Sequence, residues 1–170
     1  MAREALEVGV VVERRRLKSP WAEFSWQPVA VLPEAPAVAS WTKLDETAEA
    51  TRFYAGPSWL EFFSSDTSGY QDNLGSGLPQ LWVVLREIDT EPGISLLTVT
   101  ADPAEGESLT EPGTDIVEQL SMPHSIAERL ARFVAAHHVD RAFVKRKRDR
   151  ADPEALAHRN STVAPEKDES

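Results

Sequence analysis

The chain has 170 residues, no cysteine and a net charge of −10. Its length suits one domain with a hydrophobic core of its own. The absence of cysteine excludes disulfides, thiolate catalysis, iron–sulfur clusters and cysteine-ligated zinc. The first residues lack the apolar core of an export signal, and no stretch reaches the roughly 18 apolar residues that span a bilayer. We therefore expect a cytoplasmic protein that does not associate with membranes.

The negative charge is unevenly distributed along the chain. Residues 19–140 contain nineteen acidic and five basic residues, whereas basic residues outnumber acidic ones in residues 1–18 and 141–150. An acidic body repels phosphate, which disfavours binding to nucleic acid. An anionic partner is expected to approach only the two basic segments.

The first part of the chain predicts four strands. A β-branched run begins a strand at residues 8–16, and a second strand covers residues 26–32, where Pro28 indicates a sheet edge or a bulge. Two further strands, around residues 51–55 and 59–63, flank a Gly-Pro turn signal. This succession of neighbouring strands is typical of an antiparallel sheet.

Alternation along the first strand separates its arginines. Successive side chains of a strand point to opposite faces. Arg14 and Arg16 are therefore expected to share one face with the valines that precede them, whereas Arg15 points to the other face. Only two of the three arginines can then belong to one patch.

The middle of the chain predicts two more strands after a polar segment. Residues 64–77 are rich in turn formers and are expected to hold at most one helical turn. The run at residues 81–86 is apolar throughout, which is typical of a strand that is buried on both faces and central in its sheet. Residues 94–100 are expected to pair with it across a Pro-Gly turn.

The last third predicts a short helix, a strand and a longer helix. Asp102 and Pro103 suit the N-cap and the first position of a helix. A last strand is expected at residues 114–120. Apolar side chains then recur at helical spacing over residues 123–139, which predicts an amphipathic helix. Its buried stripe is expected to consist of Ile126, Leu130, Phe133, Val134 and His137.

Together these elements predict an α+β fold. It would comprise a mainly antiparallel sheet of about six strands, one well-defined C-terminal amphipathic helix and a short helix near residue 103. Residues 1–148 are expected to form a single domain. Residues 149–170 are predicted to be a polar, disordered tail.

No arrangement of residues in the sequence predicts catalysis. His137 and His138 are adjacent, so their rings would point about 100° apart on a helix and suit the helix end better than a shared metal. There is no G-x-S-x-G motif, and Gly75 and Gly77 are not followed by the helix that a phosphate loop requires. Paired acids lie in polar segments that suit a solvated surface. We therefore predict no catalytic residue, no metal ligand and no cofactor.

Basic and aromatic side chains provide the candidate binding residues. Tryptophan and arginine are enriched where protein interfaces bind most strongly, and basic runs contact anionic surfaces. The same side chains also suit a solvent-facing sheet edge, and the last basic run suits a solubilising tail or a segment that docks on the acidic body. The candidates are Arg14, Arg16, Lys18, Trp21, Trp26, Lys145, Arg146, Lys147 and Arg148.

Four blocks in order carry a family resemblance: GVVVERRRLKSPWAEFSWQPVAVLP, YQDNL, LPQLWVVLRE and MPHSIAERLARFVAAHHVDRAFVKRKRDR. From about Val8 to Arg150 the chain resembles a family of bacterial proteins whose genes tend to accompany molybdenum-dependent formate dehydrogenases and their maturation factors. Some members carry the label "molybdopterin-guanine dinucleotide biosynthesis protein A". That label implies a nucleotide-binding domain of alternating strands and helices with a glycine-rich loop after its first strand. This sequence has neither feature.

The resemblance implies a non-enzymatic accessory protein in the maturation or assembly of a molybdenum-dependent formate dehydrogenase. Its partner would be a dehydrogenase subunit or a maturation factor. A second hypothesis is a binding protein for an anionic small molecule such as a pterin or nucleotide cofactor, which Arg14 and Arg16 would clamp while a tryptophan stacks on its ring. Enzymatic action on such a ligand ranks third, and nucleic-acid binding ranks last. From the residues alone, a water-facing edge is the simpler interpretation of the arginines.

Overall fold

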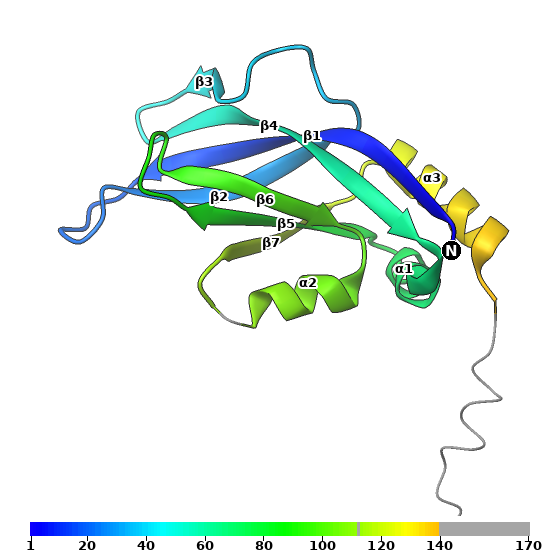
Figure 1. Ribbon diagram of the computed structural model, residues 1–170. Coiled ribbons are helices and arrows are strands. Elements are labelled where there is room, and N and C mark those ends of the chain that lie inside the picture. Colours follow the sequence, from blue (N-terminus) through cyan, green and yellow to red (C-terminus); the bar gives the residue numbers. More distant parts are fainter. Residues whose placement is uncertain (112, 140–170) are drawn as a thin grey trace, which may run out of the picture. The chain divides into compact units, whose positions relative to one another are not determined.

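The computed structural model describes residues 1–111 and 113–139, whose arrangement is drawn in Figure 1. Residues 1–138 form one compact unit. The predicted domain boundary at residue 148 and the predicted tail lie outside the described residues. The elements are β1 (Arg3–Arg16), β2 (Phe24–Leu32), β3 (Thr42–Glu46), β4 (Ala50–Phe63), a 3-10 turn η1 (Ser64–Asp66), α1 (Thr67–Gly75), β5 (Gln80–Glu87), β6 (Ile94–Thr100), α2 (Pro103–Thr110), β7 (Ile116–Ser121) and α3 (His124–His137).

The strands form two antiparallel sheets, which confirms the predicted α+β class. The first has the order β2-β1-β4-β3 and the second has the order β6-β5-β7. The described residues thus contain seven strands rather than about six. The central position predicted for residues 81–86 is confirmed, because β5 lies between its two neighbours.

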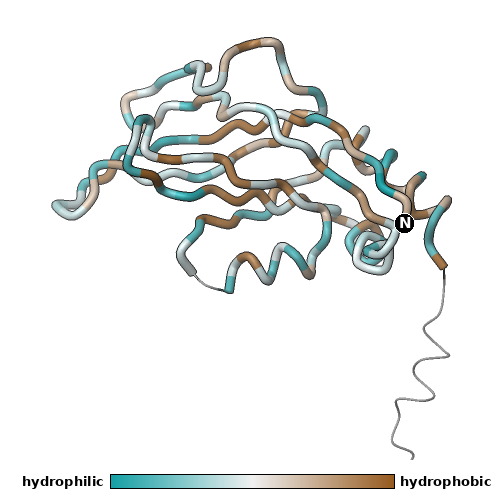
Figure 2. Tube along the Cα trace, viewed as in Figure 1, coloured by the Kyte–Doolittle hydropathy of each residue, from teal (hydrophilic) through white to brown (hydrophobic). Residues whose placement is uncertain are grey.

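One hydrophobic core joins both sheets and α3. It includes alternate residues of β1 and β5, so these strands turn one face of each sheet towards the other. Figure 2 shows hydrophobic stretches along the strands of both sheets. The alternate residues are Val8, Val10 and Val12 of β1 and Leu81, Val83 and Leu85 of β5.

Helix α3 covers one end of this core and confirms the predicted amphipathic helix. Ile126, Leu130, Phe133 and Val134 are buried as expected. His137 is exposed, so its assignment to the buried stripe is wrong: the helix ends there, and the imidazole lies against the ring of Phe133 at 4.5 Å between centroids. Within the described residues, no helix has the length and apolar character needed to cross a bilayer.

Strand β4 is continuous where the sequence predicted two strands and a turn. Gly56 has φ 130° and sits at a β-bulge: Val10 pairs with Gly56 while Val11 pairs with Tyr54, so one residue of β4 is left over. Pro57 lies beyond the part of β4 that pairs with β3, where one side of the strand has no neighbour to bond. A Gly-Pro pair therefore marks a bulge here and not a turn.

Strand β2 was predicted correctly, and both roles predicted for Pro28, a sheet edge and a bulge, are confirmed. Strand β2 lies at the edge of its sheet. Its register also slips between Val11 and Val12 of β1, where Val12 pairs with Pro28. Proline is tolerated at such places since it donates no hydrogen bond to a ladder.

Helix α1 is longer than the single turn predicted for its segment. Tertiary contacts stabilise it, because Thr67, Tyr70 and Asn73 are buried although the sequence there is rich in turn formers. The Asn73 side chain donates to the carbonyls of Gln80 and Ala101 at 2.8 and 2.9 Å and accepts from the Gln80 N–H at 2.9 Å. These bonds fasten α1 to the second sheet.

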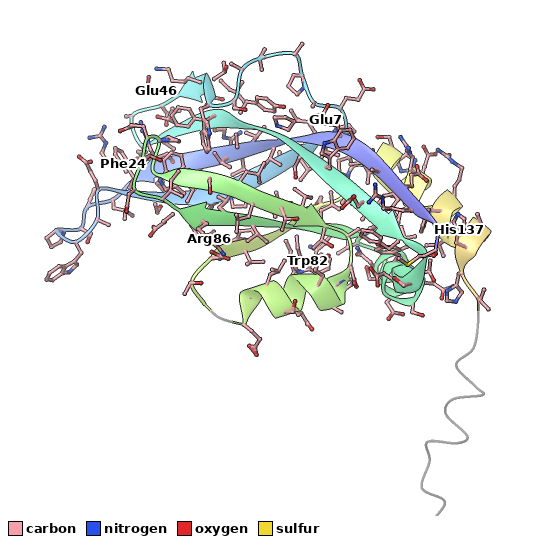
Figure 3. All side chains as sticks on the ribbon, in the orientation of Figure 1. Glu7, Phe24, Glu46, Trp82, Arg86 and His137 are labelled. Carbon is pink, nitrogen blue, oxygen red and sulfur yellow. The ribbon has the colours of Figure 1, made fainter. Side chains whose placement is uncertain are left out.

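Helix α2 starts as predicted and covers the outer face of the second sheet. The Asp102 side chain accepts a hydrogen bond from the Ala104 N–H at 3.1 Å. Gly106 continues the helix because its missing side chain makes room for Trp82: a Cβ there would lie 2.3 Å from the indole Cγ. Figure 3 shows Trp82 between β5 and α2.

Candidate functional site

The two ends of the first sheet differ in what covers them. Near its start, β1 contacts α3 through an ion pair between Glu4 and Arg129. At its far end β1 bonds, within the described residues, to β2, to β4 and to the turn between β3 and β4, and Arg14 stands opposite Trp26 while Arg16 stands opposite Phe24. Figure 3 shows Phe24 at the end of the molecule opposite His137. We call this far end the arginine end.

An aromatic cluster forms the floor of the arginine end. Trp26, Trp41 and Phe53 lie 5.9 to 6.2 Å apart between ring centroids. All three are partly buried and pack against the hydrophobic core. Trp41 precedes β3 with φ 70°, and its backbone N–H donates to the Tyr54 carbonyl. The cluster therefore draws one ring from β2, one from β4 and one from the start of β3.

The Arg14 guanidinium lies over this floor. Its central carbon is 4.3 Å from the ring centroid of Phe24, 5.2 Å from that of Phe53 and 5.8 Å from that of Trp26. Cation–π contacts of this kind stabilise a guanidinium without neutralising it. The Arg14 Nε is shielded from solvent and has no hydrogen-bond partner within the described residues. Arg14 is thus held in place with part of its donor capacity unused.

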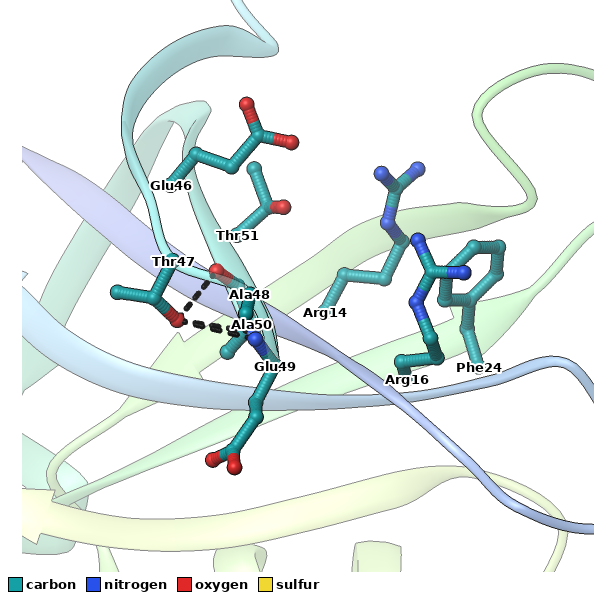
Figure 4. Close-up of a pocket in the computed structure, with 9 residues that line it drawn as sticks. All are labelled: Arg14, Arg16, Phe24, Glu46, Thr47, Ala48, Glu49, Ala50 and Thr51. Atoms are coloured by element: carbon teal, nitrogen blue, oxygen red, sulfur yellow. Dashed lines mark hydrogen bonds between the residues drawn. The ribbon is translucent and has the colours of Figure 1, made fainter.

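Arg16 lies beside Arg14, as the predicted alternation requires. Its guanidinium carbon is 5.9 Å from the same Phe24 ring, and Figure 4 shows the two guanidinium groups next to each other. Within residues 1–111 and 113–139, neither group has an ion pair or a side-chain hydrogen bond. Two positive charges therefore meet over one ring with no acid between them.

Arg15 provides a contrast on the other face of the same strand. It lies 3.3 Å from the carboxylate of Glu13, a residue that is only 7 % exposed, and Arg52 lies 3.6 Å from the same carboxylate. Glu13 thus forms an ion pair with Arg15, whereas Arg14 and Arg16 on the other face of β1 have none within the described residues.

The turn between β3 and β4 forms the opposite wall. Glu46 accepts a hydrogen bond from Lys43 at 2.8 Å, and this bond lowers the pKa of its carboxyl, with a smaller contribution from Arg14 and Arg16. Thr47 closes the turn, since its hydroxyl oxygen accepts from the Ala50 N–H at 3.1 Å. Between this turn and the arginines lies a hollow of about 240 Å³ that is open to solvent (Figure 4).

The structure brings together only some of the predicted contact residues. Arg14, Arg16 and Trp26 meet at the arginine end. Lys18 and Trp21 lie in the loop between β1 and β2, where Trp21 is 90 % exposed and is not among the rings that contact either arginine. The predicted contact residues Lys145, Arg146, Lys147 and Arg148 lie outside the described residues.

Four residues of the arginine end were missed from the sequence: Phe24, Trp41, Glu46 and Phe53. Phe24 could have been found, because it lies two positions before Trp26 on the same face of one strand. The others join the site through the pairing of β4 with β1 and β3, which local sequence does not reveal.

The chemistry available at this end is binding of an anion. The two guanidinium groups supply planar sets of donors that match carboxylate and phosphate oxygens. Among the described residues, no group of three or more His, Asp or Glu side chains is arranged to hold a metal. The adjacent histidines diverge, since His138 Nδ1 lies 3.0 Å from the Thr67 hydroxyl while His137 contacts Phe133.

Comparison with known proteins places the chain in a family. No curated protein and no solved structure matches it. Residues 7–147 match the model of a family described as "Protein of unknown function (DUF3305)". That stretch contains every strand and helix described above except the first four residues of β1. Because the match covers most of the chain, the protein belongs to this family of unknown function.

Proposed function

We propose that this chain is a non-catalytic binding protein of the cytoplasm that acts in the maturation or assembly of a molybdenum-dependent formate dehydrogenase. It contacts a dehydrogenase subunit or a maturation factor through the arginine end. The link to the dehydrogenase comes from the resemblance of the four sequence blocks to proteins encoded beside such enzymes. The observation that supports binding is the unpaired arginine pair on an aromatic floor.

The unpaired arginines favour binding because, in the part of the chain that the structure describes, five of the six other arginines have a carboxylate partner and only Arg132 of α3 has none. Arg3, Arg15, Arg52, Arg86 and Arg129 all lie within 4.0 Å of a carboxylate oxygen. In an acidic protein a carboxylate partner is easily supplied by the chain itself. A guanidinium pair without one is suited to an acid from another molecule.

The size of the hollow favours a protein partner over an enclosed cofactor. Sites that bury a small molecule usually enclose about 300 to 1,000 Å³. The cavity beside Arg14 and Arg16 has only about 30 Å³ when the open solvent of the hollow is left out. A contact between protein surfaces needs only exposed charges and rings, which the arginine end provides.

Affinity capture tests this function. The tagged chain and its Arg14→Ala/Arg16→Ala variant are expressed in cells that make a molybdenum formate dehydrogenase, and the captured proteins are identified by mass spectrometry. We expect the wild-type chain to recover a dehydrogenase subunit or maturation factor and the double variant to recover much less. Arg132→Ala is the matched control, because Arg132 is an exposed arginine of α3 far along the chain from this site. Recovery of neither class of protein, together with normal formate oxidation after gene deletion, would contradict the proposal.

Binding of an anionic small molecule is the second candidate, and the two guanidinium groups beside the Phe24 ring favour it. A phosphate or pterin oxygen could accept hydrogen bonds from both groups. A ligand that binds the folded state raises the melting temperature by mass action. Thermal-shift measurements with GTP, pterins and molybdate are the test, and an unchanged melting temperature with all of them would remove this candidate.

A further inference from the structure

We propose that Arg14 and Arg16 bind the carboxylates of an extended acidic segment of a partner protein. The inference rests on the proposed binding function and specifies the chemistry of what is bound.

The closeness of the Arg14 and Arg16 charges favours the binding of an anion. Both guanidinium groups lie within 6 Å of one Phe24 ring centroid, so they repel each other across a surface of low polarity. The aromatic rings hold Arg14 in position but accept no conventional hydrogen bond from its shielded Nε. An oxyanion placed over the pair would relieve the repulsion and accept hydrogen bonds from the terminal guanidinium nitrogens, whereas the shielded Arg14 Nε stays out of its reach.

The opposite wall reduces the advantage that a phosphate would have over a carboxylate. Glu46 lines the same hollow as the arginines and is kept ionised by Lys43, since its pKa is lowered. A doubly charged phosphate is attracted more strongly by the two arginines, but it is also repelled more strongly by this carboxylate, which offsets part of the gain. The small size of the hollow also leaves no enclosed space for a nucleotide base.

The spacing of the arginines favours an extended segment. Residues two apart on a strand lie about 7 Å apart and point to the same side. Acidic residues at alternate positions of an extended peptide have the same spacing and also point to one side. A segment with acids at every second position can therefore present one carboxylate to Arg14 and the next to Arg16.

Glu46 acts as an internal competitor that Lys43 restrains. It is the acid of the hollow whose pKa responds to both arginines, yet its hydrogen bond goes to Lys43 at 2.8 Å. Removing the Glu46 charge should leave the arginines more available to an external acid. Removing Lys43 should free Glu46 to turn towards Arg14 and compete.

The test uses a defined probe and the full chain. A fluorescein-labelled peptide of alternating glutamate and serine, blocked at both ends, is titrated with the protein at low ionic strength, and anisotropy is measured. The matching glutamine–serine peptide should not bind. Arg16→Ala should weaken binding about tenfold, as expected for the loss of a charge-assisted hydrogen bond. Added salt should weaken binding further.

Variants of the opposite wall test the competitor. Glu46→Gln should tighten binding of the acidic peptide about two- to fivefold, and Lys43→Gln should weaken it. Asp45→Asn is the matched control for charge: Asp45 is the neighbour of Glu46 in β3 and pairs in register with Arg52, beside the outer hollow that Glu13 and Arg15 line. It should change affinity less than Glu46→Gln. Equal effects of the two variants would contradict a role for Glu46 in the site.

The outcomes separate this inference from the proposed function. Equal binding of the peptide by wild type, Arg16→Ala and Glu46→Gln would overturn the inference even if the dehydrogenase is captured. Displacement of the peptide by GTP or inorganic phosphate at lower concentrations than by free acidic peptide would overturn the choice of carboxylate. Arginine-dependent peptide binding without capture of any dehydrogenase protein would support the site and contradict the proposed partner. Arg16 is exposed, so loss of folding does not confound its variant.

Discussion

Each end of the molecule contains a cluster of three aromatic rings, but the cluster near α3, at the helix end, is buried and the cluster at the arginine end is only partly buried. At the helix end, Phe62, Tyr70 and Phe133 lie 5.7 to 6.4 Å apart between centroids and are buried. At the arginine end, Trp26, Trp41 and Phe53 lie at nearly the same separations but are only partly buried. Ring geometry is therefore not what distinguishes them. The difference lies in the polar groups that accompany the rings.

At the helix end the polar groups find partners inside the protein. The Tyr70 hydroxyl accepts a hydrogen bond from the Phe63 N–H at 3.0 Å, and Arg129 of α3 is paired with Glu4. At the arginine end Arg14 and Arg16 form no ion pair with any described residue, although Glu46 lines the same hollow. Natural sequences depart from such consistency mainly at functional positions. The comparison thus assigns a role in stability to the helix end and supports the proposed binding role of the arginine end.

The largest expected effect is at the helix end. Phe133→Ala should reduce the free energy of unfolding by about 3–5 kcal/mol, because it leaves a cavity among fully buried rings. Urea denaturation followed by circular dichroism measures this loss. Trp26→Ala, which removes a larger but partly exposed ring, is the matched change at the arginine end and should cost less. A greater loss for Trp26→Ala would break the comparison.

An intermediate effect is expected from Tyr70. Burial raises its pKa to about 12 from an ordinary value of 10.0. The neutral phenol is thus favoured in the folded state, and its contribution to stability is complete below pH 10 and is lost as pH rises towards 12. Tyr70→Phe should remove this alkaline loss, at a cost of about 1–2 kcal/mol at neutral pH because the Phe63 N–H loses its acceptor.

Urea unfolding of both proteins at pH 8 and at pH 11 tests the Tyr70 prediction. Tyr54, whose pKa is also raised by burial, titrates in both proteins and cancels in the comparison. The stability gap between wild type and variant should narrow at the higher pH. A gap that stays constant would show that Tyr70 does not titrate differently in the folded and unfolded states.

A small effect is expected from Arg16. Its side chain is exposed and contacts one ring, so Arg16→Ala should change the free energy of unfolding by less than about 0.5 kcal/mol. Its affinity for acidic peptide should nevertheless fall. Urea denaturation and peptide anisotropy on the same preparation measure the two effects. A loss of more than about 1 kcal/mol in the free energy of unfolding would show that Arg16 stabilises the fold.

Local sequence patterns predicted most of the strands and the helices α2 and α3, and there is a physical reason for this. Alternating or continuous apolar runs report burial directly, which is why β1, β2, β5 and β6 were found. Strand β3 was missed and helix α1 was predicted too short because their residues are largely polar. They are stabilised by pairing with β4 and by the contacts of Asn73, which depend on residues distant in sequence.

The site was predicted to the same limited extent. Alternation correctly placed Arg14 and Arg16 on one face. Nearness in sequence suggested that Trp21 joins them, but the loop carries it into solvent. Phe53 and Trp41 belong to the site because of strand register, which no local pattern encodes.

Replacing Arg14 by methionine tests the central claim most directly, because it measures stability and binding in one variant. Methionine fills similar space and lacks the unpaired charge and the shielded donor, so the free energy of unfolding should stay within about 1 kcal/mol of wild type or rise. Affinity for the acidic peptide should fall about tenfold or more. Those two results together are predicted by the account. A loss of several kcal/mol of stability with unchanged peptide affinity would contradict it.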